Sequence, residues 1–244
     1  MTSRKAILIG NSGGYRNLKH LKGVRIDLEN YRNYLKSKAG GQWHENEITI
    51  LHDADSSTIL NEIKNISADY TFTTCSGHGF INTYSSSDHV CLSDIDLQIG
   101  KLAYKSVKQT IIIDACREVI THTPEDLTKA FVLESKTQAE GKDTRELFDM
   151  EIEKMPKGIL VVFSTQANEA AGDDDSKGGH FTYSFLKSGR DWWNNLNNRG
   201  TFRIDSAITE AEKIMKATFL TNQNPALGGQ SRRLTFPPLA FSKL

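Results

Sequence analysis

The sequence predicts an α/β domain built on a mostly parallel sheet with helices on both faces, and two patterns carry this prediction. Short β-branched runs recur along the chain, and segments with a helical spacing of apolar residues lie between them. Strands that alternate with helices form βαβ units, which arrange the strands in parallel. The 244 residues fit one large domain of this class, so we treat 1–244 as a single domain.

The strands are expected where β-branched and other apolar residues cluster between turn residues. These clusters lie at residues 6–9, 48–51, 70–75, 110–113 and 159–163, and weaker ones at 90–92 and 234–236. The runs 111–113 and 160–162 are entirely apolar, which is typical of central parallel strands buried on both faces. These two segments are therefore expected in the middle of the sheet.

Three helices are expected from apolar residues that recur every three or four positions. The first contains Val24, Leu28, Tyr31 and Leu35 and ends before Gly40-Gly41. The second follows the capping pair Asp55-Ser56, and the third lies late in the chain. Their apolar faces are Ile59, Ile63 and Ile66 for the second and Ile208, Ala211 and Met215 for the third.

The composition excludes several classes of protein. Thirty Lys and Arg balance thirty Asp and Glu at a pI of about 7.1, so no global field favours nucleic acid or an anionic membrane as a partner. No window approaches about 18 apolar residues, and three cysteines indicate a reducing compartment. We expect a cytoplasmic protein. The final Ser242-Lys243-Leu244 would be a peroxisomal signal in a eukaryote.

Candidate catalytic residues follow two of the expected strands. His78 and Gly79 come after the strand at 70–75, and Cys116 comes after the strand at 110–113. In a parallel sheet, ligands and catalytic groups gather beyond the carboxyl ends of the strands. An imidazole beside a thiol can convert it to the nucleophilic thiolate, and the amides of Gly79 and Cys116 could form an oxyanion hole.

These motifs resemble those of the caspase-like cysteine proteases (peptidase family C14), and the metacaspase and prokaryotic branch is the nearest. Ser76-Gly77-His78-Gly79 is similar to the family's histidine motif, and the strand ending in Asp114-Ala115-Cys116 is similar to its nucleophile motif. The segments that show weaker similarity extend over most of the chain. They are residues 6–10, 21–27, 163–172, 179–186 and 223–227.

The resemblance implies a fold, a mechanism and a specificity. The fold would be a six-stranded sheet flanked by helices, with Cys116 as nucleophile and His78 as acid and base. Asp27 and Asp114 match the acidic positions that line the metacaspase pocket for basic residues, so we expect cleavage of protein substrates after Arg or Lys. Related stand-alone enzymes are regulated effectors of defence or cell death. An activating partner or a small ligand is therefore expected.

A long polar stretch at 121–157 occupies the position of the caspase linker. It contains several potential cleavage sites for a protease of basic specificity, so self-processing is a hypothesis. These sites include Lys129, Lys136, Lys142, Arg145 and Lys154. The interval of 38 residues from His78 to Cys116 is shorter than the roughly 50 known in caspases, which predicts a trimmed connection. The pair Arg117-Glu118 predicts a different path after the nucleophile.

Three alternatives remain open at this point. Cys75, His78, His89 and Cys91 have the short spacings of zinc ligands. The chain could also be a non-catalytic signalling or ligand-binding module with the same fold. No cofactor is expected, although two acidic groups supply oxygens that could bind calcium. The two groups are Asp88, Asp94 and Asp96, and Asp173, Asp174 and Asp175.

Overall fold

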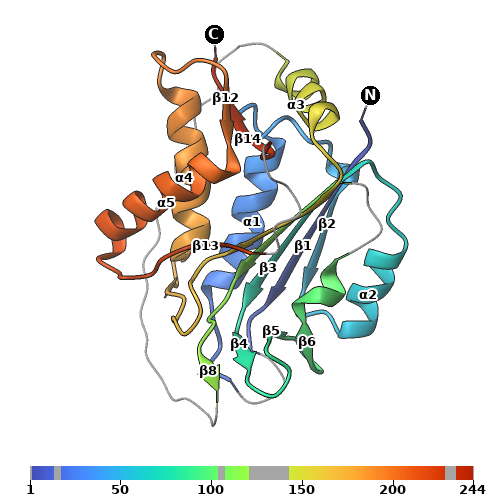
Figure 1. Cartoon of the computed structure of the whole chain (residues 1–244), viewed down its shortest axis with the longest axis vertical. Coiled ribbons are helices and arrows are strands. Elements are labelled where there is room, and N and C mark those ends of the chain that lie inside the picture. The colour runs from blue at the N-terminus through green and yellow to red at the C-terminus, as the bar shows by residue number, and fades with distance from the viewer. Residues whose placement is uncertain (1, 14–17, 104–107, 121–142, 229–234, 244) are drawn as a thin grey trace.

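A six-stranded sheet forms the centre of the computed structural model, which describes residues 2–13, 18–103, 108–120, 143–228 and 235–243. The strand order is β13-β9-β7-β3-β1-β2, and β13 alone runs antiparallel to its neighbour (Figure 1). The strands are β1 (Arg4–Asn11), β2 (Ile48–His52), β3 (Tyr70–Gly77), β7 (Lys108–Asp114), β9 (Gly158–Phe163) and β13 (Ala226–Gly228). The predicted fold class is confirmed.

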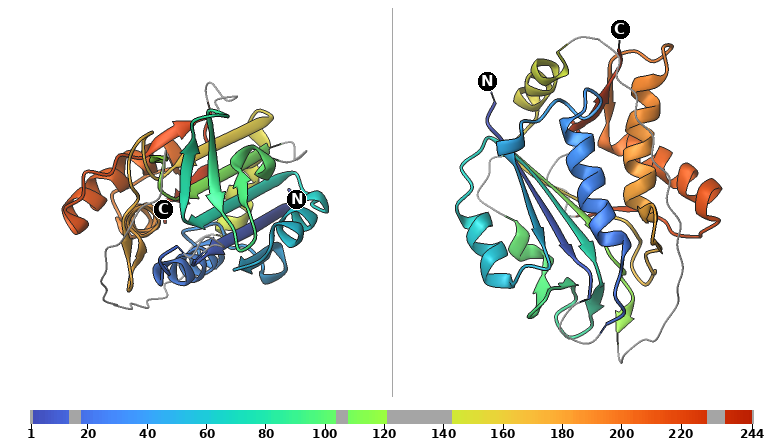
Figure 2. Two further views of the ribbon diagram at one scale, coloured as in Figure 1. Left: turned by 90° about the horizontal axis from the view of Figure 1, so that it is seen from below. Right: turned by 180° about the vertical axis from the view of Figure 1, so that it is seen from behind.

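Side chains of β1 alternate between two apolar cores, because successive residues of a strand point to opposite faces. Ala6 and Leu8 face the larger core, whereas Ile7 and Ile9 face the smaller one. The larger core is covered by α1 (Gly23–Lys36), α3 (Thr144–Lys154), α4 (His180–Asn194) and α5 (Ile204–Phe219). In Figure 2, α1 and α4 lie side by side across this face. The expected helices at 24–35 and 208–215 are therefore confirmed.

The smaller core lies under α2 (Ser56–Lys64) and the 3₁₀ turn η2 (Ile99–Leu102). Asp55 caps α2 as predicted, because its side chain accepts a hydrogen bond from the Thr58 N–H at 2.7 Å. Ile59 and Ile63 are buried in this core, but α2 ends before Ile66. Another 3₁₀ turn, η1 (Glu45–Glu47), leads into β2.

Short strands outside the main sheet were mostly not predicted. A four-stranded sheet of order β6-β5-β4-β8 lies near the carboxyl ends of the central strands (Figure 1). It consists of β4 (Gly79–Asn82), β5 (Ser87–Cys91), β6 (Asp96–Gln98) and β8 (Val119–Ile120). The weak strand expected at 90–92 belongs to β5. Two strand pairs complete the chain, namely β10 (Asp173–Asp174) with β11 (Gly178–Gly179), and β12 (Thr201–Arg203) with β14 (Pro238–Phe241).

Two sequence predictions were wrong in part. The stretch 121–157 is not all linker, because α3 occupies Thr144–Lys154 and buries Phe148 and Ile152 in the larger core; residues 121–142 lie outside the described residues. The strand expected at 234–236 is absent at 235–236, and residue 234 is not described. Strand β14 begins only at Pro238, where the apolar run 239–241 becomes buried.

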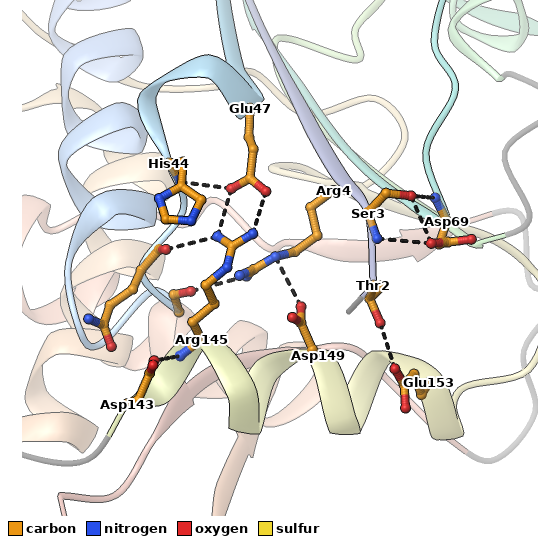
Figure 3. A network of polar contacts seen from close by, with 12 residues as sticks. Thr2, Ser3, Arg4, His44, Glu47, Asp69, Asp143, Arg145, Asp149 and Glu153 are labelled. Atoms are coloured by element: carbon orange, nitrogen blue, oxygen red, sulfur yellow. Dashed lines mark hydrogen bonds and ion pairs between the residues drawn. The ribbon is translucent and has the colours of Figure 1, made fainter.

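A polar network joins α3 to β1 and to η1, at the end of the sheet opposite the carboxyl ends of the parallel strands (Figures 1 and 3). The buried guanidinium of Arg4 forms an ion pair with Asp149 at 3.1 Å and donates to the Gly41 carbonyl at 3.0 Å. Arg145 donates to both carboxylate oxygens of Glu47, at 2.6 and 2.8 Å. The helix that follows residues 121–142 is thus fixed to the first strand.

Candidate active site

His78 and Cys116 lie at one edge of the sheet because β3 and β7 are neighbours. Ser76 pairs in register with Asp114, and His78 and Cys116 each come two residues after this pair. Both residues line a cavity of about 80 Å³, which we call the candidate pocket. Its walls come from residues 21–27, 76–78, 114–116 and 171–179. The structure therefore brings together the site residues that the sequence singled out.

Gly79 is needed where the His78 segment meets the Cys116 segment. A Cβ atom on Gly79 would lie 2.8 Å from the Ala115 Cβ and 3.0 Å from the Cys116 carbonyl oxygen. Such distances are too short for carbon contacts, so a side chain here would push the two segments apart. The close approach also places the Gly79 and Cys116 backbones side by side, as an oxyanion hole would require.

The His78 ring is oriented by a backbone carbonyl. Its Nε2 atom lies 2.7 Å from the Lys19 carbonyl oxygen. A carbonyl can only accept, so Nε2 carries the proton and the neutral ring keeps Nδ1 free of one. Burial lowers the pKa of His78 below its usual value, and the Lys19 carbonyl partly opposes this shift. The ring is therefore neutral at pH 7 and able to accept a proton.

The Cys116 thiol lies beside Ala171 of the loop after β9. Its Sγ atom accepts a hydrogen bond from the Ala171 N–H at 3.3 Å. Burial raises the pKa of Cys116, and the Ala171 amide acts in the opposite direction. The resting thiol is therefore protonated at neutral pH. Nucleophilic attack by Cys116 requires a base that removes this proton during the reaction.

Asp27 and Asp114 both lie at the candidate pocket and both are buried. Asp27 accepts hydrogen bonds from the Ser76 hydroxyl and from the Gly179 N–H at 2.9 Å. Asp114 accepts from the backbone and the hydroxyl of Thr182, at 3.0 and 2.7 Å. Burial raises the pKa of both carboxyls. The negative charges of Asp114 and of Asp173 raise the pKa of Asp27 further. Within the described part of the chain, neither has a Lys, Arg or His partner.

Asp173 is a third pocket carboxylate that the sequence analysis did not place there. It lines the candidate pocket, and the Gly23 N–H at the start of α1 donates a hydrogen bond to it. Burial and the nearby Asp114 raise its pKa to about 6. Its position directly after the similar segment 163–172 was an available signal, but the run of three aspartates was interpreted as a calcium candidate.

The proposed metal ligands have other partners in the structure. Asp88 forms an ion pair with Arg117 at 2.6 Å, and Asp94 accepts from the Ser56 N–H at the start of α2 at 2.9 Å. Burial raises the pKa of Cys75 to about 12, so this thiol is not a ready zinc ligand. Among the residues that the structure describes, no three His, Cys, Asp or Glu side chains are placed to hold a metal ion.

The chain after Cys116 continues into the small four-stranded sheet as strand β8. Strand β8 pairs in parallel with β4, and the Arg117 guanidinium lies 3.9 Å above the centre of the Phe163 ring. Arg117 also exchanges backbone hydrogen bonds with the loop after β9, at Glu169 and Asn168. The segment that follows Cys116 is therefore held by β4, by the Phe163 ring and by the loop after β9.

Comparison with known proteins shows the family of this chain. The model of the caspase domain, peptidase family C14, matches residues 3–235 of the chain. The chain belongs to the caspase family of cysteine peptidases. Caspase-1 of Spodoptera frugiperda has a similar structure, with a TM-score of 0.63 and 16% sequence identity over 98% of this chain and 92% of that chain. At this identity the likeness shows the caspase fold alone.

Two further findings concern this caspase-family chain. A search of curated protein sequences returns no significant match. In the parts of the chain that the structure describes, no helix has the length and apolar character that a membrane crossing requires. The last residue of the C-terminal Ser-Lys-Leu lies outside the described residues.

Proposed function

We propose that this caspase-family peptidase cleaves protein substrates after Arg or Lys, with Cys116 as nucleophile and His78 as general acid and base. The observation that carries the proposal is that carboxyl groups gather in the candidate pocket without a cationic partner. Asp27, Asp114 and Asp173 converge there, and the described residues supply no cation to pair with the first two. A basic side chain of the substrate supplies the missing positive charge.

The neutral dyad favours proton transfer coupled to attack. Nδ1 of His78 accepts the thiol proton while Sγ of Cys116 attacks the scissile carbonyl carbon, and the amides of Gly79 and Cys116 stabilise the oxyanion. The His78 imidazolium then protonates the leaving amine, and a thioester remains on Cys116. Water, deprotonated by His78, hydrolyses the thioester and restores the thiol. The Lys19 carbonyl holds Nε2 throughout this cycle.

Arginine is the preferred residue because its shape matches several carboxylates. The planar guanidinium presents five donors and can engage two carboxylates at once, whereas the lysine ammonium is a single point of charge. Asp114 uses one of its oxygens for Thr182. An acidic side chain would meet like charge and is excluded. This basic specificity is the metacaspase type, and the same resemblance suggests a regulated effector of defence or cell death.

The substitution Asp114→Ala tests the specificity. Removing one partner of a buried charge pair costs about 2–5 kcal/mol, so we expect kcat/KM on Arg and Lys peptides to fall at least about 30-fold. Cys116 should stay at least as reactive toward iodoacetamide as in the wild type, because the dyad is retained and the Asp114 charge raises the pKa of the thiol.

A positional peptide library with the wild type, Asp114→Ala and Cys116→Ala provides the measurement. Asp69→Ala is the matched control, since this exposed acid bonds to Ser3 at the opposite end of β3. Undiminished turnover of basic peptides by Asp114→Ala would contradict the assignment. If an arginine-directed electrophile fails to label Cys116 in the wild type, the chain is a non-catalytic module with the caspase fold.

A further inference from the structure

The carbonyl that orients His78 belongs to a loop that is tied back to the end of β1. Lys19 and Leu21 lie on this loop, and the Leu21 N–H donates to the Ser12 carbonyl at 2.6 Å. Ser12 is buried and follows directly after β1. Because Leu21 also lines the candidate pocket, the position of Ser12 affects both the Lys19 carbonyl and the pocket wall.

Ser12 itself is held by a side chain from the end of the neighbouring strand β2. The Asp53 carboxylate accepts a hydrogen bond from the Ser12 N–H at 2.7 Å, and the Asp53 N–H donates to the Gly10 carbonyl at 2.8 Å. Asp53 adopts a left-handed conformation with φ of 52°. This conformation turns the chain sharply after β2, and Asp is among the residues that tolerate it.

The remaining contact at this point involves His52. Its Nε2 atom lies 2.9 Å from the Ser12 hydroxyl and 3.3 Å from an Asp53 carboxylate oxygen. The three side chains are not a second hydrolytic triad, since serine and aspartate meet the same ring nitrogen instead of opposite ones. These contacts connect the carboxyl ends of β1 and β2.

We propose that Asp53 is a positioning residue for the catalytic histidine: it fixes Ser12, Ser12 fixes the 18–22 segment, and the Lys19 carbonyl of that segment fixes the His78 ring. The inference rests on the proposed function, in which His78 acts as acid and base. It assigns a role to Ser12, which follows directly after β1. A ring displaced by about 1 Å loses up to about 100-fold in rate.

Two substitutions distinguish the role of Asp53 as a hydrogen-bond acceptor from the effects of its charge and of its backbone conformation. Asp53→Asn and Asp53→Gly both remove the charge and both tolerate positive φ, but Asn alone keeps an oxygen that can accept from the Ser12 N–H. Asp53→Ala is a second variant without an acceptor. Asp55→Ala is the stability control, because Asp55 caps α2 and contacts neither Ser12 nor the 18–22 segment.

The readouts are kcat and KM on an arginine peptide, and the downfield NMR signal of the His78 Nε2–H, assigned by its loss in His78→Ala. We expect Asp53→Gly and Asp53→Ala to lose about tenfold or more in kcat together with the signal. Asp53→Asn should stay within about threefold of the wild type and keep the signal. Asp55→Ala should lower the melting temperature without affecting either readout.

The outcomes are distinct. Wild-type kcat and an intact signal in folded Asp53→Gly and Asp53→Ala would overturn the proposal, and so would equal losses in Asp53→Asn and Asp53→Gly, which would assign the effect to charge. A wild type that cleaves no basic peptide contradicts the proposed function instead. The NMR signal then decides the positioning role by itself.

Discussion

The carboxyl of Asp173 has a pKa raised to about 6, because burial and the nearby Asp114 both disfavour its ionised form. A carboxyl whose pKa is higher in the folded protein than in the unfolded chain binds protons more tightly when folded, so its ionisation destabilises the fold. This cost is fully present above about pH 6 and disappears below the usual value of 3.8. The charge that attracts a basic substrate therefore lowers stability.

Replacing Asp173 with Asn should separate these two effects. We expect Asp173→Asn to raise the free energy of unfolding by about 1–3 kcal/mol at pH 8, and to have only a small effect at pH 3.5, where the Asp173 carboxyl is mostly protonated in the folded and the unfolded wild type. At pH 8 its kcat/KM on arginine peptides should fall because one pocket charge is lost. Urea denaturation at both pH values checks the first result, and peptide hydrolysis checks the second. Lower stability than the wild type at pH 8 would contradict the assignment.

Neighbouring aspartates differ in ways that the sequence does not reveal. The Asp173 side chain turns toward Gly23 and the pocket, whereas Asp174 accepts from the N–H groups of Ser176 and Lys177 in its own turn. Asp175 pairs with Lys22. His78, Cys116, Asp27 and Asp114 could be predicted because strand ends and motif positions fix them. The place of Asp173 after segment 163–172 was a signal that some residue there lies near the pocket, but only the β10–β11 turn decides which of the three carboxylates faces it.

Helix α3 shows the same limit at the scale of an element. Its sequence is mostly charged, and the apolar residues Phe148 and Ile152 were too few to stand out from the polar stretch around them. Its charges are matched by long-range partners on η1 and β1, which no local pattern indicates. Helices α1, α2 and α5 and the buried strands were predictable from the spacing of their apolar residues, whereas α4 was not among the expected helices. The strands of two to five residues that form the small sheet depend on tertiary pairing.

The substitution Asp149→Ala tests how much α3 depends on the network of Figure 3. It leaves the buried guanidinium of Arg4 without its carboxylate, so we expect a loss of about 3–5 kcal/mol in the free energy of unfolding. Glu153→Ala on the same helix removes a partly buried hydrogen bond to Thr2 and should cost less than about 1.5 kcal/mol. Chemical denaturation compares the two variants.

Neither variant should change KM, because α3 lies at the opposite end of the sheet from the candidate pocket (Figure 1). Equal stability of Asp149→Ala and Glu153→Ala would contradict this prediction, because the Arg4 ion pair would then contribute no more to the fold than the Thr2 hydrogen bond.

At the scale of the whole molecule, the candidate pocket is built from both sides of residues 121–142. His78, Asp27, Asp114 and Cys116 precede this stretch, while Asp173 follows it. Strand β9, which also follows it, pairs with β7 over six residue positions in the middle of the sheet. The two parts of the chain therefore form one sheet and one site, and we expect their association not to depend on the covalent connection between them.

We therefore expect the two fragments to stay associated after self-processing. Arg145 lies within α3 with its guanidinium bound to Glu47, and Lys154 ends the same helix, so both are poor sites for a protease that needs an extended substrate. Lys129, Lys136 and Lys142 remain as candidates, and they lie outside the described residues. We expect cleavage after one or more of these lysines in the wild type and none in Cys116→Ala.

Intact-mass spectrometry identifies the fragments, and size-exclusion chromatography shows whether they stay together. The pairing of β7 with β9 and the ion pairs from β1 and η1 to α3 predict that both fragments elute together at the position of the uncut chain. Fragments of equal abundance in Cys116→Ala would assign the cleavage to another protease. Separate elution would mean that the connection through 121–142, and not the sheet, holds the two halves of the pocket in place.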